Sequence, residues 1–175
     1  MLFRSIPWDD DIDLSMPRED YQRFINIFQK EKSKYKLLSL ETDKNYFNNF
    51  IKITDSTTKI IDTRNTKTYE SGVFIDIFPM DRFDDPKVID ICYKLESFKL
   101  LSFSKHKNIV YKDSILKDWI RTAFWLLLRP VSPRYFANKI EKEIQKYSRE
   151  NGQYMAFIPS KLKEKEVFPS GTFDK

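Results

Sequence analysis

The chain has 175 residues, a formal net charge of +5 and 41% hydrophobic residues, which is enough apolar material for one domain with its own core. Its 3 glycines exclude a glycine-rich phosphate loop, its 1 cysteine excludes an intrachain disulfide, and its 1 histidine excludes a zinc site built from histidines. The lysines mostly alternate with glutamates, and no nucleic-acid-binding motif is present. We therefore expect a solvated basic surface and no nucleic-acid partner.

The first predicted elements are a strand and a helix. The strand covers residues 6–14, "IPWDDDIDL", where four carboxylates stand inside an apolar frame. Pro17 then falls where a helix prefers proline, in its first turn. From Tyr21 to Phe28 apolar residues recur at i, i+3, i+4 and i+7, which predicts an amphipathic helix to about Lys32.

Several short strands follow, and residues 72–79, "GVFIDIFP", form the clearest of them. This run starts on a glycine, ends on a proline and holds one carboxylate, Asp76. After it the apolar spacing becomes helical, so we predict one α+β domain over residues 1–175 with a helical second half. The other predicted elements are strands over 35–40, 49–54 and 59–63, helices over 88–98, 114–129 and 136–147, and a short strand or loop over 154–159.

Residues 123–128, "AFWLLL", form the longest apolar run, which is far shorter than the ~20 residues that span a bilayer. We expect this run to be a buried helix face. Contact with a membrane surface through Trp119, Phe124, Trp125 and residues 126–128 is the alternative. The single cysteine favours a reducing compartment, so we expect a cytoplasmic protein.

The acidic stretch within residues 6–14 predicts a metal site. Successive side chains of a strand alternate between its faces, so Asp9, Asp11 and Asp13 would share one face while Ile12 and Leu14 form an apolar underside. Carboxylate oxygens are hard ligands that suit Mg²⁺ or Mn²⁺, with substrate phosphates completing the shell.

The strand over 72–79 would supply a further carboxylate. Alternation places Asp76 on the face of Phe74 and Phe78, opposite the neighbouring isoleucines. Carboxylates from two neighbouring strands would hold metal ions that clamp the attacking and leaving oxygens of a phosphoryl transfer. The bound cation would offset the mutual repulsion of the aspartates, about 1 kcal/mol per close pair in water and about 4 kcal/mol at a protein edge.

Three alternatives compete with this interpretation. A run of aspartates is often an exposed acidic turn, although here apolar residues interleave with it. Asp9, Asp11 and Asp13 also match the start of a calcium-binding EF-hand loop, but Leu14 stands where that loop needs glycine and Asp20 where it needs glutamate. Metal-dependent glycosyltransferases likewise use a D-x-D site, so the motif alone does not separate sugar transfer from phosphoryl transfer.

Two stretches together resemble a known family. "IPWDDDIDLSMPREDYQRF" and, about sixty residues later, "GVFIDIFPMD" look like the LicD family of phosphocholine transferases, which is related to the fukutin-type transferases within the nucleotidyltransferase superfamily. The closing "FPSGTFDK" is similar to the start of a later region of that family. The resemblance implies a mixed β-sheet with flanking helices. The family's basic run before the acidic motif and its continuation after Lys175 are missing, so we expect a domain shortened at both ends.

The resemblance also implies an activity. The family transfers a phospho-alcohol, typically phosphocholine from CDP-choline or a similar CDP-alcohol, to a cell-surface glycan such as lipopolysaccharide, capsule or teichoic acid, with Mg²⁺ or Mn²⁺ as cofactor. Because the glycan acceptor can be lipid-linked, we expect at most peripheral contact with the inner face of the membrane. Two hypotheses remain beside it, a D-x-D glycosyltransferase and an inactive truncated remnant with a binding role only.

By position, the resemblance implies roles for three aspartates of the two motifs. Asp11 and Asp13 correspond to the paired metal-binding carboxylates, and Asp76 completes the catalytic site and helps to deprotonate the acceptor hydroxyl. Asp9 is implied as an outer or alternative metal ligand.

Two further residues are candidates for substrate binding. Arg18 would hold a phosphate with both arms of its guanidinium, or form a surface ion pair with nearby acids instead. Trp8 would stack on a base or sugar, with a place in the core as the alternative. Asp81 is a candidate for capping or for supporting the site from behind.

Overall fold

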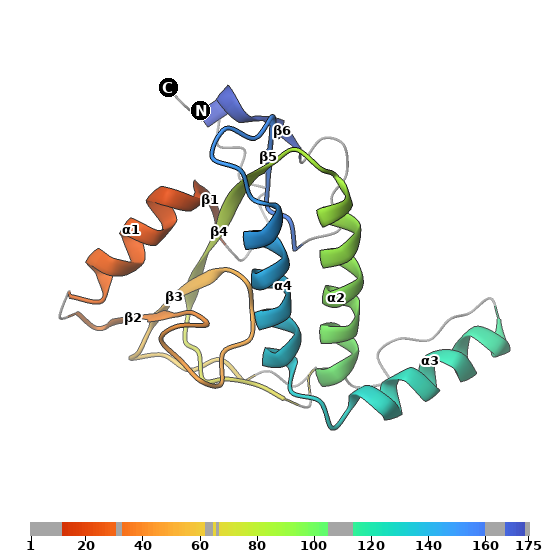
Figure 1. Cartoon of the computed structure of the whole chain (residues 1–175). Coiled ribbons are helices and arrows are strands. Elements are labelled where there is room, and N and C mark those ends of the chain that lie inside the picture. Colours follow the sequence, from red (N-terminus) through yellow and green to blue (C-terminus); the bar gives the residue numbers. More distant parts are fainter. Residues whose placement is uncertain are drawn as a thin grey trace.

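The structure, a computed structural model, describes residues 12–30, 33–61, 65, 67–104, 114–159 and 167–173. Strands and helices alternate irregularly in the first half of the chain, and helices dominate the second half (Figure 1). The elements are β1 (Asp13–Pro17), α1 (Arg18–Phe28), β2 (Tyr35–Leu38), β3 (Ile51–Asp55), β4 (Phe74–Phe83), α2 (Lys87–Phe103), α3 (Ile115–Leu128), α4 (Pro133–Tyr147), β5 (Tyr154–Ala156), β6 (Phe168–Pro169) and the 3₁₀ turn η3 (Ser170–Phe173).

The strands form one mixed sheet in the order β2-β3-β4-β5-β6, with β1 paired to β4 outside this path. β1 runs parallel to β4, whereas the other neighbouring strands are antiparallel. The long strand β4 is the centre of the sheet because its first half pairs with both β1 and β3 and its last residues pair with β5. The predicted α+β class with a mixed sheet and flanking helices is confirmed.

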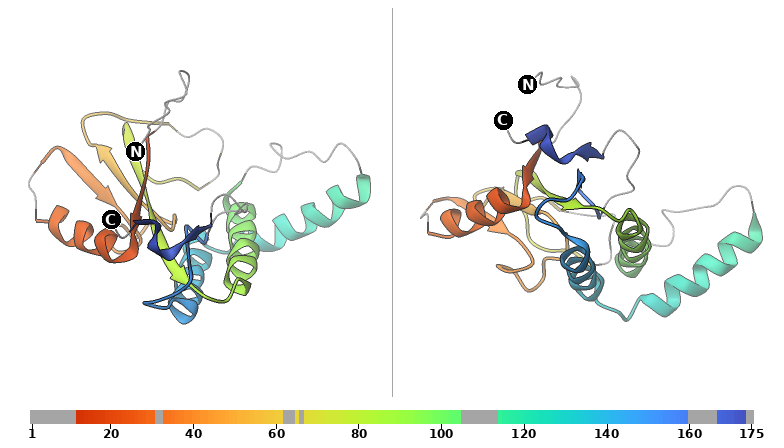
Figure 2. Two further views of the ribbon diagram at one scale, coloured as in Figure 1. Left: turned by 90° about the horizontal axis from the view of Figure 1, so that it is seen from above. Right: turned by 45° about the horizontal axis from the view of Figure 1, so that its top comes forward.

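Helices α1, α2 and α4 lie on one side of the sheet (left view of Figure 2). The apolar face of β4 supports two clusters there. One joins α1 to β2, β3 and β4 through Tyr21, Ile25, Leu37, Ile51 and Ile77. The other joins the end of β4 to α2, α4 and β5 through Phe83, Val88, Cys92, Ile140, Ile144, Ala156 and Ile158.

Most predicted elements are present, with shifted ends. The first helix follows Pro17 as predicted but ends at Phe28, where its apolar spacing stops, instead of near Lys32. Of the predicted strand over 6–14, residues 6–11 lie outside the described residues. β1 begins at Asp13 and continues beyond the predicted end to Pro17, because its parallel ladder with β4 reaches that residue. Of the predicted strand over 59–63, Ile60 forms an isolated bridge with Ser71.

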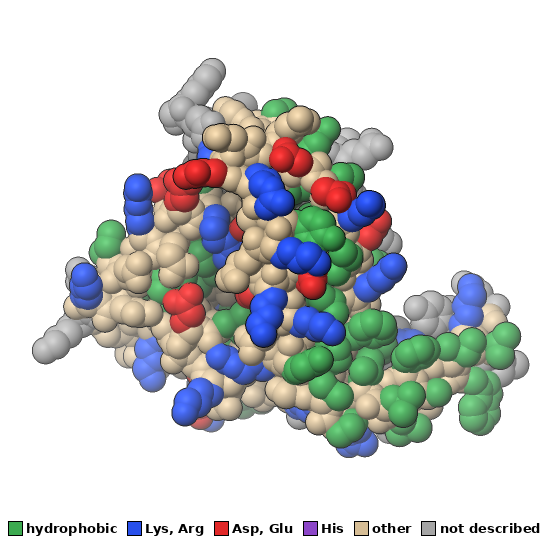
Figure 3. All heavy atoms as spheres, in the orientation of Figure 1, with side chains coloured by type: hydrophobic (Ala, Val, Ile, Leu, Met, Phe, Trp, Pro, Cys, Tyr) green, Lys and Arg blue, Asp and Glu red, His purple; other side chains and the backbone are tan. Residues whose placement is uncertain are grey.

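The expectation that residues 123–128 form a buried helix face is wrong. These residues lie in α3, and Leu126 and Leu127 are exposed. In Figure 1 α3 leads away from the packed helices α2 and α4, and Figure 3 shows hydrophobic side chains gathered along it. No helix within the described residues is long and apolar enough to cross a membrane.

Candidate functional site

Strand register brings two of the predicted aspartates together. Asp13 of β1 is the partner of Asp76 in the parallel β1–β4 ladder, and the backbone N–H of Asp76 donates to the carbonyl of Ile12 at 3.0 Å. On the other side of β4, Asp76 is the partner of Lys52 in β3. Side chains of partners in register lie on the same face of a sheet, so Asp13, Asp76 and Lys52 form one row, which we call the acidic row.

The acidic row lies on the sheet face that α1, α2 and α4 leave uncovered. Ile75 and Ile77 of β4 belong to the cluster beneath α1, and Asp76 between them faces the opposite way. The predicted apolar underside of β1 is only partly formed: Met16 packs against this cluster, while Ile12 and Leu14 are exposed. Alternation therefore placed Asp13 and Asp76 on one face, as the register shows, but overestimated the burial of their neighbours.

Lys52 is the functional candidate that sequence reasoning missed. Its Nζ lies 2.6 Å from Oδ1 of Asp76, and the two residues are 4% and 8% exposed. The ammonium also lies 3.0 Å from the ring centroid of Phe74. The signal was present in "NFIKIT", where a lysine stands between two isoleucines of a buried strand. A buried lysine needs an anionic partner, and the predicted carboxylate of the neighbouring strand was available.

The acidic row has the donor chemistry for a hard cation. Neighbouring strands lie about 4.8 Å apart, so the Asp13 and Asp76 carboxylates leave the sheet side by side. Asp76 is buried and Asp13 is exposed, which keeps one edge of the row open. No group of three His, Cys, Asp or Glu side chains within the described residues could hold a metal ion. A cation here would thus need a further ligand besides this pair.

Three predicted site residues lie outside the described residues. These are Trp8, Asp9 and Asp11, so their placement stays a prediction. Alternation from Asp13 continues to favour Asp11 for the face of the acidic row.

A cavity of about 370 Å³ opens beside Lys52 and Phe74. Tyr69 forms part of its wall, and the Asn48 amide donates to the Tyr69 hydroxyl at 2.8 Å. The Phe47 ring packs edge-on against Tyr69, with 5.4 Å between their centroids. A pocket of this size with aromatic walls and a few polar groups suits a small ligand. We call it the Lys52 cavity.

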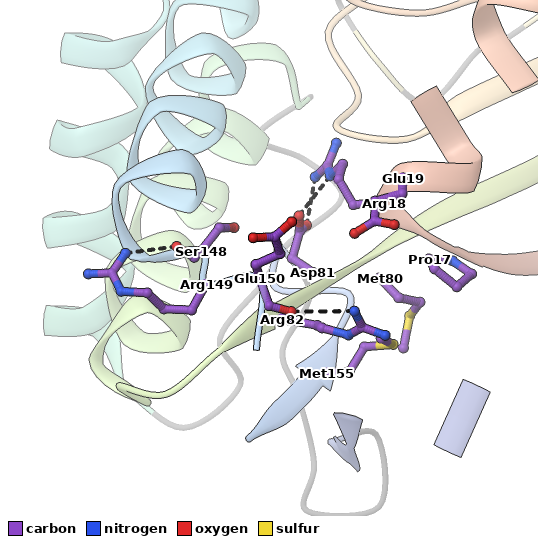
Figure 4. A pocket seen from close by; sticks show the side chains of 10 residues that line it. All are labelled: Pro17, Arg18, Glu19, Met80, Asp81, Arg82, Ser148, Arg149, Glu150 and Met155. Carbon is purple, nitrogen blue, oxygen red and sulfur yellow. Dashed lines mark hydrogen bonds and ion pairs between the residues drawn. The ribbon is translucent and has the colours of Figure 1, made fainter. Parts of the chain in front are cut away.

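Arg18 is engaged on the opposite face of the sheet. Its Nε and an Nη donate to the two carboxylate oxygens of Asp81 at 2.7 and 2.6 Å (Figure 4). Its other Nη lies 3.6 Å from a carboxylate oxygen of Glu141. The bidentate partner predicted for Arg18 was a phosphate, and the alternative was a nearby acid. Both arms instead contact an aspartate 63 positions away in sequence.

Burial shifts the pKa values of the charged groups around Arg18. Desolvation raises the pKa of Asp81, which is 2% exposed, and the guanidinium opposes that shift. Desolvation likewise raises the pKa of Glu141, again opposed by Arg18. For Arg18, burial acts to lower the pKa, but its hydrogen bonds and charge contacts with Asp81 outweigh this and raise it. The arginine therefore stays charged between two carboxylates.

A polar network ties the start of β3 to the helices. The Asn49 amide nitrogen donates to the carbonyl of Ala137 at 2.9 Å and to Glu141 at 3.0 Å. Its oxygen accepts from Lys99 of α2 at 3.1 Å, and Lys99 also lies 2.6 Å from Glu96. Buried polar groups that satisfy one another in this way fix relative positions, so Asn49 anchors the strand that carries Lys52.

Fold and site together define an α+β domain with helices on one face of a mixed sheet and paired carboxylates on the other face. Residues 4–138 match the family described as LicD/FKTN/FKRP, nucleotidyltransferase domain, and the chain belongs to this family. The resemblance seen in the two motifs is confirmed.

A curated relative shares much of the same region. The lipopolysaccharide cholinephosphotransferase LicD of Haemophilus influenzae is 37% identical over 120 residues, which is 66% of this chain and 40% of that protein. The chain thus spans well under two thirds of the length of this relative. No solved structure matches the chain.

Proposed function

We propose that the chain is the nucleotidyltransferase domain of an enzyme that transfers phosphocholine from CDP-choline to lipopolysaccharide or a related cell-surface glycan. The observation that carries the proposal is the register of Asp13 with Asp76 on the open face of the sheet, within the region that matches the family. The name of the curated relative supports lipopolysaccharide as the acceptor. A cytoplasmic position, where CDP-alcohols would be supplied, completes the proposal.

Mg²⁺ or Mn²⁺ would be held by Asp11, Asp13 and Asp76, with Asp9 as an outer ligand. The donor set is all carboxylate, which fits these cations. When bound, the cation would neutralise negative charge that develops on the transferred phosphoryl group. In this proposal the Asp76 carboxylate would accept the proton of the acceptor hydroxyl, and its burial in the acidic row supports that role.

In this proposal the Lys52 cavity receives the phosphocholine end of the donor. The Lys52 ammonium would bind a phosphate oxygen, and the aromatic ring of Tyr69 in the cavity wall would favour the quaternary ammonium of choline. Arg18 keeps a supporting role, since its two donor arms already contact Asp81.

The test uses the intact protein, CDP-choline labelled in the choline and lipopolysaccharide lacking phosphocholine. We expect label to reach the acceptor with Mg²⁺ or Mn²⁺ and to stop with EDTA. Asp13→Ala should abolish transfer, whereas the exposed Glu70→Ala should leave it unchanged. Absence of both metal-dependent transfer and donor hydrolysis in the unmodified protein would overturn the proposal.

An inhibition experiment and a titration separate phospho-alcohol transfer from the glycosyltransferase and inactive-remnant hypotheses. Inhibition of labelled transfer by CDP-alcohols, with no effect of UDP-sugars or GDP-sugars, supports phospho-alcohol transfer over a glycosyltransferase. Titration with Mn²⁺ followed by CDP addresses the inactive remnant. Metal binding without nucleotide binding would favour the remnant.

A further inference from the structure

Helix α3 is amphipathic, but its apolar side is exposed and most of its polar side is turned toward the protein. Its apolar face points to solvent, and its polar residues Asp118, Arg121 and Thr122 are the less exposed ones. In a helix of a globular domain the apolar stripe normally faces the core. The exposed positions recur every three or four residues along one face: Leu116, Trp119, Ile120, Ala123, Phe124, Leu126 and Leu127.

Contacts near its C-terminal end orient α3. The Trp125 indole N–H donates to the carbonyl of Ser104, the residue after α2, at 3.0 Å, and the Arg129 guanidinium lies 5.1 Å from the Trp125 ring centroid. The Phe124 ring stacks on Phe98 of α2 with 6.4 Å between centroids. These contacts hold the polar side toward the body, so the outward apolar face follows from packing.

The exposed face has the composition of a membrane-interface helix. Trp119 is 72% exposed and Leu127 is 70% exposed, values typical of charged surface residues rather than of tryptophan and leucine. A groove of about 610 Å³ between α2 and α3 adds Leu100, Leu101 and Ile120 to the same apolar surface. Large contiguous apolar surface of this kind marks a binding face.

The charges beside this face favour an anionic partner. Lys117 is exposed next to the apolar residues and lines the groove together with Arg121, and Arg129 follows the last turn. The only acid between residues 114 and 131 is Asp118. Helices with Trp, Phe and Leu on one side and cationic residues at the border lie in the headgroup region of membranes.

We propose that α3 binds the surface of an anionic membrane, with Leu116, Trp119 and Leu127 entering the headgroup–acyl boundary and the exposed Lys117 and Arg129 contacting lipid phosphates. The helix is too short to span the bilayer, so it lies in the plane of the interface. This surface is distinct from the acidic row and needs no donor or acceptor to act. It would hold the domain beside lipid-anchored glycans.

The test measures co-sedimentation of the full chain with vesicles of phosphatidylglycerol and phosphatidylcholine. We expect binding that weakens with salt and is much lower on pure phosphatidylcholine. The double variant Leu116→Glu/Leu127→Glu should lower binding at least ~10-fold, because the added charges oppose insertion. The matched control Ile27→Glu/Val73→Glu, at residues of similar exposure on other elements, should bind as the unmodified chain does.

A second measurement locates the helix in the bilayer. In a Trp8→Phe/Trp125→Phe variant the remaining tryptophan is Trp119, and brominated lipids should quench its fluorescence. Equal vesicle binding by both Glu variants, or absence of quenching, would overturn the proposal. So would light scattering that shows a stable dimer abolished by Leu116→Glu/Leu127→Glu, since the face would then bind a second copy of the chain. Circular dichroism confirms that each variant is folded.

Discussion

Strand β4 carries two buried aspartates, Asp76 and Asp81, that differ in their partners and in the face they occupy. Asp81 lies on the helix-covered face and takes both arms of Arg18. Asp76 lies on the opposite face, and its carboxylate contacts the ammonium of Lys52. A guanidinium that donates two hydrogen bonds to one carboxylate is typical of a structural ion pair. In the proposed function Asp76 serves catalysis while Asp81 serves stability, so burial alone does not tell a structural acid from a catalytic one.

The largest expected effect comes from Asp76→Asn. If Asp76 binds metal and accepts the acceptor proton, its loss should lower the transfer rate by about 10³-fold, which is about 4 kcal/mol of barrier. The amide keeps the shape and still accepts a hydrogen bond from Lys52, so the thermal midpoint should move little. Labelled transfer and differential scanning calorimetry measure the two effects. A rate within tenfold of the unmodified protein would make Asp76 a structural residue like Asp81.

Asp81→Ala should act on stability instead. The substitution removes the carboxylate that pairs with the Arg18 guanidinium and leaves a cavity in its place. Breaking such a buried ion pair should lower the free energy of unfolding by about 3 kcal/mol. Urea denaturation measures the free energy of unfolding, with Glu70→Ala as the exposed control. If Asp81→Ala left the free energy of unfolding unchanged but removed activity, the roles assigned to the two aspartates would be reversed.

Lys52→Met probes the partner of Asp76. Without the ammonium the acidic row carries uncompensated negative charge, so Mn²⁺ should bind about tenfold more tightly, corresponding to about 1.4 kcal/mol. Transfer should nevertheless fall, because the phosphate ligand of the Lys52 cavity is gone. Calorimetric titration with Mn²⁺ measures the affinity, and Lys36→Met, at an exposed lysine of β2, is the control. Weaker Mn²⁺ binding would show that Lys52 positions Asp76 for the metal.

Arg18→Lys should have a smaller effect. Lysine cannot form the bidentate contact with Asp81, which should cost about 1–2 kcal/mol of folding stability. The KM for CDP-choline should stay unchanged, because the guanidinium lies on the face opposite the acidic row. A tenfold rise in KM with unchanged stability would restore the phosphate-binding role first predicted for Arg18.

The smallest effect concerns Cys92, which shares the helix-covered face with Asp81. Burial raises the pKa of this thiol to about 12, so at pH 8 the reactive thiolate is about 10³-fold scarcer than for an ordinary thiol with pKa near 8.5. Thiol reagents should leave the native chain unlabelled and label it fully in denaturant. Since the folded pKa is raised, native labelling would begin only well above pH 8. Rapid native labelling at pH 8 would mean that this face opens readily.

Local patterns in the sequence predicted the acidic row in part. Alternation put Asp13 and Asp76 on faces that could meet, provided that their strands were neighbours, as we expected. The register that joins them also brings in Lys52, and register between distant strands is set by packing that periodicity does not describe. The Arg18–Asp81 pair could not be predicted for the same reason, since both residues lie in short motifs with other plausible partners.

Helix α3 shows a different limit. Its apolar spacing correctly predicted a helix over 114–129, and the same kind of spacing predicted α4. In α4 the apolar face is buried through Phe136, Ile140 and Ile144, as expected. Periodicity identifies an apolar face but not what covers it, so α3 was assigned to the core by default.

The order of the elements along the chain determines when each part of the sheet can be covered during synthesis. β1, β3 and β4 all lie within the first 83 residues, so the acidic row is encoded ahead of α4, which begins at Pro133. During synthesis at about 5–20 residues per second, the end of β4 at Phe83 would wait several seconds for α4. Ile77 can be covered earlier, because α1, β2 and β3 precede it in the chain. Phe83 is therefore the buried apolar residue of β4 that stays exposed longest in the nascent chain.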